Sequence, residues 1–521
     1  MWGRNRLEKE IEQQAAVTIT YEDKLIKTGE VFPPEMDRER LSDYKRLRKA
    51  FDGETEDIVA RAESILSDTP HSKQLDMLRI AINLSDILAT KPADMLVGEA
   101  PLFESGLIEN TEVQDIINGY VEKNNLIQLI HESAIGNGIR GDAWFKVRFG
   151  YRQDYSALEE LGFPIPDTAE MEPIVEHVAA DCVFPETARG NVKQFKAVNI
   201  ATVEYVVSNK KETPFLNVER HLPGYIVYER YRLHEGGVDT TYNYPLQTWR
   251  VGEQVATGRE TDIEETGIPH ILVQHVPYKS TDDRWNGISG IKHLYPLLVA
   301  INDRITQIDY ILWKHSDPNS YGPDLDTQST NRVRMGGVYI PTTKEDVTPG
   351  YMTWDGKLDA AFKELEILIG CVFQLSEIPQ WIFGTTLGET NVGGTGTSHT
   401  DSTAIKVRFM PILSKVARIR THYDRTIKDI LYLCQLMDIT HGGKTFEPKI
   451  PSIEWKDGLP ESDAELAEIM SVRTGGKATI DVLSAIKRLD GLDDEGARDI
   501  IRRIEGEEEL IDASIFNETE A

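Results

Sequence analysis

The residues best suited to bind a ligand lie in the segment from Thr386 to Thr400, TLGETNVGGTGTSHT, which precedes a long amphipathic pattern. Four of its fifteen residues are glycine, and a glycine-rich turn that leads into a helix can bind phosphate through backbone N–H groups. A P-loop also needs a lysine, yet no lysine lies between Lys363 and Lys406. A dinucleotide-binding turn follows a strand, whereas the preceding segment has a helical pattern. We therefore expect a mobile polar loop.

The same segment offers a nucleophile in Ser398, followed by His399 and Asp401. A catalytic triad converges in space, and neighbours in sequence rarely form one. The sequence also has no G-x-S-x-G elbow. Ser398 or Thr400 is better interpreted as a helix cap.

Two further patterns fail as metal sites. The segment that begins at Asp317 resembles the start of an EF-hand loop but has Gln328 where that loop needs an acid, so a turn is expected. His131 and Glu132 are not followed by a second histidine at zinc-binding spacing. No metal or cofactor is therefore expected, and the residues alone indicate no active site.

Composition narrows the class of protein. The chain has 521 residues, enough for two to four domains, and its 27% charged and 40% hydrophobic residues are typical of a folded protein. The net charge of −29 argues against a basic DNA-binding face. Three distant cysteines favour reduced thiols in a cytoplasmic setting. No apolar run approaches about 20 residues, so no transmembrane helix is expected.

Hydrophobic periodicity predicts the elements that must position these residues. The first third is mainly helical, and antiparallel strands follow from about residue 143 to about 275. A continuous helix is expected from Gly290 to His315, then a short β-like segment, RMGGVYIPTT, and a second helix within KLDAAFKELEILIGCVFQLSEIP. A third helix of about ten turns follows the glycine-rich segment, with a kink at Pro411. Short acidic helices end the chain, with Asp463 and Asp481 near their caps.

The third helix carries a basic stripe formed by Lys406, Arg408, Lys415, Arg418, Arg420, Arg425 and Lys428. Such a stripe can bind nucleic acid, but aromatic residues that would stack on bases are sparse there. We favour pairing with acidic groups of this chain or of a neighbouring subunit.

The order of segments resembles the portal proteins of tailed bacteriophages. The likeness rests on GIPHILVQHVPYKSTDDRWNGISGIKHLYPLLVAINDRITQIDYIL, in which a proline-containing strand and an Asp-rich turn lead into W-N-G-I-S-G-I and a long helix. NLSDILATKPADMLVGEAP and GIRGDAWFKVRF resemble wing segments of that family, and the acidic C-terminus resembles its crown. The resemblance covers nearly the whole chain.

The resemblance implies an α+β fold, the phage portal fold with a wing, stem helices, a small α/β clip, a long kinked helix and an α-helical crown. Its parts would be the wing at 1–287, stem helix 1 at 288–316, the clip at 317–357, stem helix 2 at 358–379, the tunnel loop at 380–400, the kinked helix at 401–438, a linker at 439–455 and the crown at 456–521. The clip looks short for the family.

The resemblance also implies a structural, non-enzymatic role. The chain would form a ring, usually a dodecamer, at the portal vertex of the virion after assembly in the host cytoplasm. That ring passes double-stranded DNA without sequence specificity during packaging and ejection. Its partners would be further copies of itself, the major capsid and scaffolding proteins, the large terminase packaging motor and a head–tail adaptor, with no membrane partner.

Candidate DNA-facing residues follow from the same resemblance. In the tunnel loop they are Asn391, Gly393, Gly394, Thr395, Gly396 and Thr397, and in the stem they are Lys292, Arg304 and Lys314. The stem cations have an alternative role as partners of acidic groups on a neighbouring subunit. Two other functions stay open, namely a nucleotide-dependent enzyme that uses the loop at 386–400 and another structural head–tail protein.

Overall fold

The computed structural model divides the chain into two compact units. The first unit comprises Met1–Thr390 and Met410–Asp457, and the second comprises Asn391–Phe409 and Gly458–Ala521. The described residues are 24–54, 82–106, 111–208, 210–316, 319–323, 339–342, 348–352, 358–380, 402–456, 463–490, 492 and 496–506. None of the helices in these ranges combines the length and hydropathy that crossing a bilayer requires.

The N-terminal part of the first unit is mainly helical, which confirms the periodicity. Its elements are β1 (Val31–Phe32), α2 (Glu35–Phe51), α5 (Leu84–Leu96), β2 (Leu102–Glu104), α6 (Thr111–Lys123) and α7 (Leu126–Arg140). Helix α5 begins where the Asn83 side chain accepts a hydrogen bond from the Asp86 N–H. Helix α7 ends at Gly141, whose φ of 97° lies in the left-handed region that favours glycine.

Antiparallel sheets occupy the predicted β-rich region. The strands are β3 (Asp142–Tyr151), β4 (Met171–Val178), β5 (Val183–Ala188), β6 (Asn191–Ser208), β7 (Lys211–Leu222), β8 (Tyr225–Asp239), β9 (Leu246–Val255), β10 (Ile263–Glu265) and β11 (Val273–Pro277). One sheet has the order β1-β9-β8-β7-β6-β5, with β10 paired to β8, and a second has the order β11-β3-β4. Two short helices that the sequence did not predict, α8 (Ser156–Glu160) and η1 (Ala180–Cys182), interrupt the strands.

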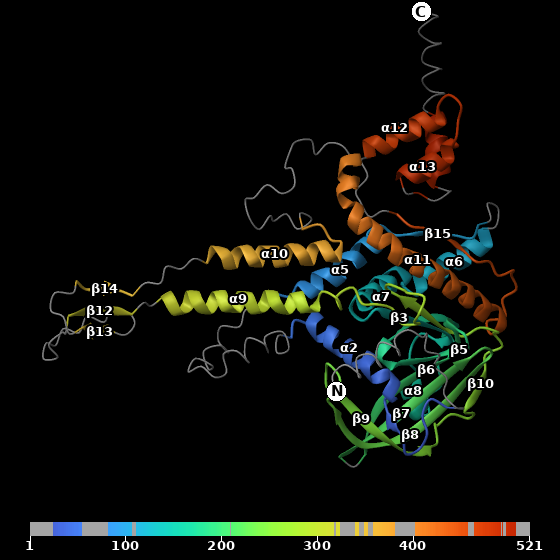
Figure 1. Ribbon diagram of the computed structural model, residues 1–521. Helices are drawn as coiled ribbons and strands as arrows, with labels where there is room; N and C mark the ends of the chain where they lie inside the picture. The colour runs from blue at the N-terminus through green and yellow to red at the C-terminus, as the bar shows by residue number, and fades with distance from the viewer. Residues whose placement is uncertain are drawn as a thin grey trace, which may run out of the picture. The chain divides into compact units, whose positions relative to one another are not determined.

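A hydrophobic core joins α2 to the larger sheet (Figure 1). The helix contributes Leu41 and Tyr44, and alternate residues of the strands, such as Val198, Leu216 and Val251, face them. Successive side chains of a strand point to opposite faces of the sheet, and one face of this sheet packs on the core. Apolar residues therefore tend to alternate with polar ones in this part of the sequence.

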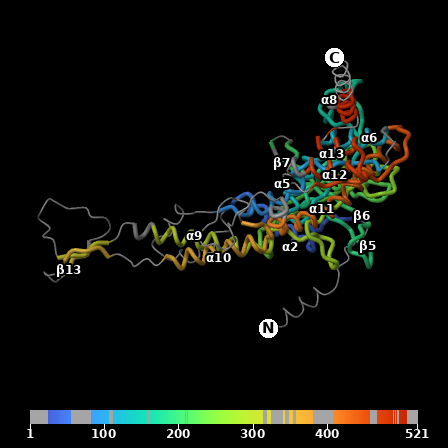
Figure 2. Tube along the Cα trace, turned by 90° about the horizontal axis from the view of Figure 1, so that it is seen from above, coloured from blue at the N-terminus to red at the C-terminus, as the bar shows by residue number. Residues whose placement is uncertain are grey.

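Within the first unit the chain runs along α9 (Tyr295–Ser316) to a three-stranded sheet and returns along α10 (Asp359–Ser376). The two helices lie side by side in both views (Figures 1 and 2). The sheet consists of β12 (Ser320–Pro323), β13 (Tyr339–Thr342) and β14 (Gly350–Tyr351), with β12 parallel to β13 and antiparallel to β14. The described part of the expected α/β clip therefore contains strands alone.

Two expectations for this region are corrected. Helix α9 begins at Tyr295 instead of Gly290, because the Gly290 N–H bonds to the Gly138 carbonyl and the chain turns once before the helix. Part of the expected turn after Asp317 is strand β12, because pairing with two other strands satisfies its backbone groups.

Helix α11 (Ser402–Thr440) matches the expected third helix, and it continues through Pro411. The expected linker contains β15 (Ser452–Glu454), which pairs with β2. In the second unit the acidic segment forms α12 (Asp463–Thr474), α13 (Val482–Asp490) and a helix at 496–506. Asp481 accepts a hydrogen bond from the Ser484 N–H, which confirms it as a cap. The Asp463 side chain lies outside the described residues.

Candidate functional site

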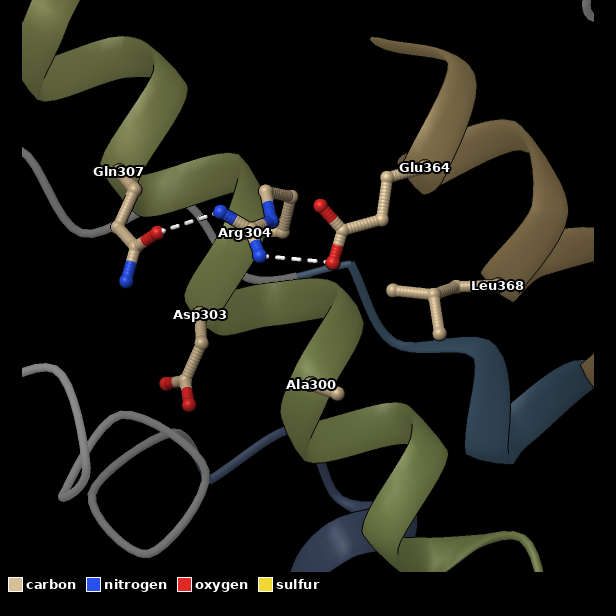
Figure 3. Close-up of a pocket in the computed structure, with 6 residues that line it drawn as sticks. All are labelled: Ala300, Asp303, Arg304, Gln307, Glu364 and Leu368. Atoms are coloured by element: carbon tan, nitrogen blue, oxygen red, sulfur yellow. Dashed lines mark hydrogen bonds and ion pairs between the residues drawn. The ribbon is translucent and has the colours of Figure 1, made fainter. Parts of the chain in front are cut away.

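The pair of helices α9 and α10 contains two of the three stem residues that the sequence singled out. A small cavity of about 160 Å³ lies between them, lined by Ala300, Asp303, Arg304, Gln307, Glu364 and Leu368 (Figure 3). The Arg304 guanidinium donates to Glu364 Oε1 at 2.7 Å across the pair, and to Gln307 Oε1 at 2.9 Å on its own helix. The cavity has room for a few water molecules.

The Arg304–Glu364 ion pair links the two helices but adds little to their stability. Both side chains are partly exposed, at 33% and 49%, and ion pairs at such positions contribute little free energy because water screens them. The contact therefore links α10 to α9 across the cavity, which two carboxylates, Asp303 and Glu364, also line.

Lys292 lies just before α9, at the base of the helix pair. Its ammonium group bonds to Asp43 Oδ2 of α2 at 2.6 Å. Lys292 and Arg304 thus have acidic partners within the same chain, where the sequence allowed either DNA or a neighbouring subunit. Lys314 belongs to α9, but its side chain lies outside the described residues.

The loop candidates have no described position. Asn391, Gly393, Gly394, Thr395, Gly396 and Thr397 lie outside the described residues, as do Ser398, His399 and Asp401. Their role in a tunnel stays a prediction, and so does the kink expected at Pro411.

Helix α10 exposes large apolar side chains on opposite sides. Phe362, Ile367 and Leu375 are 49%, 57% and 64% exposed. At about 100° per residue, Ile367 and Leu375 lie roughly 80° apart, and Phe362 lies opposite the midline between them. Val372, by contrast, is fully buried. The exposed apolar groups of α10 therefore do not lie on a single side of the helix.

The base of α9 is held by a buried carboxylate that the sequence analysis did not single out. Asp142, at the start of β3, accepts hydrogen bonds from the Tyr44 hydroxyl, from His275 Nε2 at 2.7 Å and from the Gly287 N–H at 2.7 Å. Its carboxylate is fully buried. These bonds join α2, β11 and the turn before α9 at one point.

The backbone around Asp142 is equally tight. The Tyr278 N–H donates to the Gly141 carbonyl, and a Cβ on Gly287 would lie 2.0 Å from that oxygen. The segments GIRGDAWF and WNGISG therefore contact each other, and glycine at these positions permits the close approach. The sequence provided no direct indication of this contact, although both segments belong to the stretches that resemble portal proteins.

The basic stripe on α11 makes contacts within the chain. Lys415 donates to the Ser376 carbonyl at 2.9 Å, Arg418 binds both carboxylate oxygens of Glu377 at 2.6 and 2.7 Å, and Lys428 bonds to Asp424 at 2.7 Å. Arg420 donates to the carbonyls of Met95 and Lys456. Arg418 and Lys428 thus pair with acidic groups of this chain, as the favoured interpretation expected, whereas Lys415 and Arg420 bond to backbone carbonyls.

The histidine, cysteine and acidic side chains of the described residues do not form a metal site. No group of three or more His, Cys, Asp or Glu side chains there is arranged to hold a metal ion. His131 bonds to Asp94 at 3.1 Å, and the three cysteines are free thiols. Burial raises the pKa of the Cys182 thiol to about 11, so it is a poor nucleophile at neutral pH.

Comparisons with known proteins give likenesses to solved structures but none to a family or a curated sequence. No protein-family model and no curated protein sequence matches the chain. Among solved structures, a chain from the "Neck of empty GTA particle computed with C6 symmetry" aligns over 93% of this chain and 97% of its own length. The identity is 10% and the TM-score is 0.41, a level at which neither fold nor function is inferred.

Proposed function

We propose that this chain is a structural subunit of the head–tail region of a tailed-phage-like particle, and specifically a portal-type ring protein. The ring would surround a channel for double-stranded DNA and bind the packaging motor and the head–tail adaptor. The proposal rests on the resemblance of the ordered segments to portal proteins. The structural observation that supports it most is the exposed apolar surface on opposite sides of α10.

That observation supports a ring for a geometric reason. A subunit in a ring meets one neighbour through one face and the next neighbour through a different face, whereas a twofold dimer uses one self-complementary face. Phe362 lies on one side of α10 and Ile367 about 140° away, while Leu375 lies on the side of Glu364 and Leu368, which face α9; we propose that Phe362 and the Ile367–Leu375 side meet different neighbours. Lys363 lies between them on the helix wheel, on a polar strip suited to solvent.

Charge supports the same role. A net charge of −29 per subunit repels DNA phosphates on average, which suits a channel through which DNA slides. The proposed wing, clip, tunnel loop and crown have the boundaries given above, whereas the helix of the first stem segment begins at Tyr295. Terminase, capsid, scaffolding and adaptor proteins are proposed partners, and DNA contacts are assigned to the tunnel loop at Asn391–Thr397.

The first test is the oligomeric state of the purified protein, measured by light scattering after size exclusion and by negative-stain microscopy. We expect a ring with a central channel. A stable monomer or dimer without a channel contradicts the proposal.

A pair of variants tests the two faces. F362E should damage one face and I367E/L375E the other, so neither variant should form rings alone. An equimolar mixture retains one intact contact per pair and should give dimers. K363E on the polar strip is the matched control and should still form rings. Rings that persist in both face variants would remove α10 from the interface.

The loop has a separate test in a packaging assay. Replacing Gly393 and Gly394 with proline should leave ring assembly intact and impair DNA packaging, because proline restricts the backbone where glycine permits movement. Normal packaging by this variant would show that freedom of the loop backbone is not required.

A further inference from the structure

The hairpin of β6 and β7 extends beyond the rest of the larger sheet. Strand β5 pairs with β6 only as far as Ile200, and β8 pairs with β7 only from Phe215 onward. The pairing of β6 with β7, however, continues to Ser208 and Lys211. Beyond the ends of β5 and β8 the hairpin is therefore a two-stranded arm, and no further described strand pairs with it on either side.

One face of this arm exposes apolar side chains. Val203 packs against the hydrophobic core, and side chains two residues apart share one face of a strand, so Tyr205 and Val207 lie on the same face as Val203. Tyr205 is 54% exposed and Val207 is 66% exposed. The Tyr205 ring contacts that of Trp249, with 6.2 Å between the ring centroids. The apolar face of the sheet thus continues past the core into solvent.

The charge at the end of the arm indicates what kind of surface covers this face. Lys210 and Lys211 lie at the turn, and Glu212 is the acidic residue that follows them. Glu204, nearer the sheet, forms an ion pair with Arg230 at 3.0 Å. The end of the arm therefore has a net positive charge on a chain whose net charge is −29, which favours an acidic partner surface.

We propose that the arm packs on a second copy of this chain, with Tyr205 and Val207 against its surface and the two lysines beside its acidic groups. A second copy is acidic on average, and the proposed ring holds copies side by side. DNA phosphates would match the lysines but would leave the apolar face in water, so a protein surface fits better. This inference rests on the proposed ring and adds a contact separate from α10.

Photo-crosslinking of the full-length protein tests the contact. The photoreactive residue p-benzoylphenylalanine takes the place of Tyr205, and the assembled protein is irradiated and analysed by denaturing gel electrophoresis and mass spectrometry. We expect covalent dimers of the chain. Tyr225 is the matched control, because it is 46% exposed on β8 of the same sheet but lies outside the arm, and the same replacement there should give few dimers.

The outcomes separate the arm from the ring. Crosslinks from position 205 that stay within one chain, or that join added duplex DNA in place of a second copy, overturn the proposal. If microscopy shows rings while position 205 gives no covalent dimers, the arm contact is refuted and the proposed ring stands. If the wild-type protein forms no rings and no dimers, both proposals fail.

Two sets of variants separate the apolar contact from the charge. Y205S/V207T should raise the subunit concentration needed for half-assembly by about tenfold, because it removes exposed apolar surface that the contact would bury. K210E/K211E should also weaken assembly. R189E/K196E makes the same change in net charge at exposed positions outside the arm and should assemble like the wild type.

Urea unfolding of each variant at the wild-type midpoint shows that the subunit itself is intact. Wild-type assembly by Y205S/V207T, or equal assembly by the two charge variants, overturns the proposal.

Discussion

Replacement of Asp142 by alanine should destabilise the first unit more than any surface substitution. The change leaves three buried hydrogen-bond donors without their acceptor, namely the Tyr44 hydroxyl, the His275 Nε2–H and the Gly287 N–H. Each unsatisfied buried group costs about 1–3 kcal/mol, so the free energy of unfolding should fall by roughly 3–9 kcal/mol.

Asp142→Asn separates hydrogen bonding from packing. The side chain keeps its size and one oxygen, which can still accept hydrogen bonds from His275 and Gly287. Its NH2 group faces the Tyr44 hydroxyl, which can accept a hydrogen bond from it. The expected loss is about 1 kcal/mol, well below that of Asp142→Ala.

The assay is urea unfolding followed by the fluorescence of the tryptophans, because Trp144 and Trp285 flank His275 in the same cluster. Glu253→Ala is the control, since Glu253 is 71% exposed and lies 3.8 Å from Arg232. It should change stability by less than about 1 kcal/mol. If Asp142→Ala unfolds at the wild-type urea concentration, the carboxylate does not hold the base of α9 and the reasoning fails.

Three further predictions concern single contacts. Burial raises the pKa of Glu219, but hydrogen bonds from His221 and Lys146 outweigh it and lower the pKa to about 2. The ionised Glu219 therefore stabilises the fold above its ordinary pKa of 4.5, and up to about 3 kcal/mol of the free energy of unfolding is lost as the pH falls from 4.5 to 2. Glu219→Gln should flatten this part of an acid-unfolding curve. An unchanged curve would contradict the assignment. A double-mutant cycle of Arg304→Ala and Glu364→Ala should give a coupling free energy of about 0.2–1 kcal/mol, because the pair is partly exposed, and a value above about 2 would mean that water does not screen it. Gly287→Ala should lower the free energy of unfolding in urea by about 3 kcal/mol, because the new Cβ would lie 2.0 Å from a backbone oxygen. A Cβ at Gly224 would have no atom within 4 Å, so Gly224→Ala should lower it by only about 1 kcal/mol, which is the cost of a φ of 88°. Equal losses would show that the close approach at Gly287 is relieved elsewhere.

Sequence periodicity determined where the regular elements lie. The helices α9, α10 and α11 were predicted within a few residues, apart from the start of α9, and the antiparallel strands were predicted as a region whose limits match β3 to β11. Spacings of three and four, or of two, are local properties of the chain and can be recognised without knowledge of the tertiary contacts. The expectation that the stripe on α11 would form ion pairs holds for Arg418 and Lys428.

The tertiary structure alone decided which groups meet. Asp142 and Gly287 are 145 residues apart, and no local pattern predicts that one accepts a hydrogen bond from the other. Lys415 and Lys428 look alike on the sequence of α11, yet one is buried on a helix terminus and the other bonds to a neighbour on its own helix. The burial of a side chain and the identity of its hydrogen-bond partners depend on segments that are distant in the sequence and meet only in the folded chain. Burial and partners together decide whether a charged group stabilises or destabilises the fold.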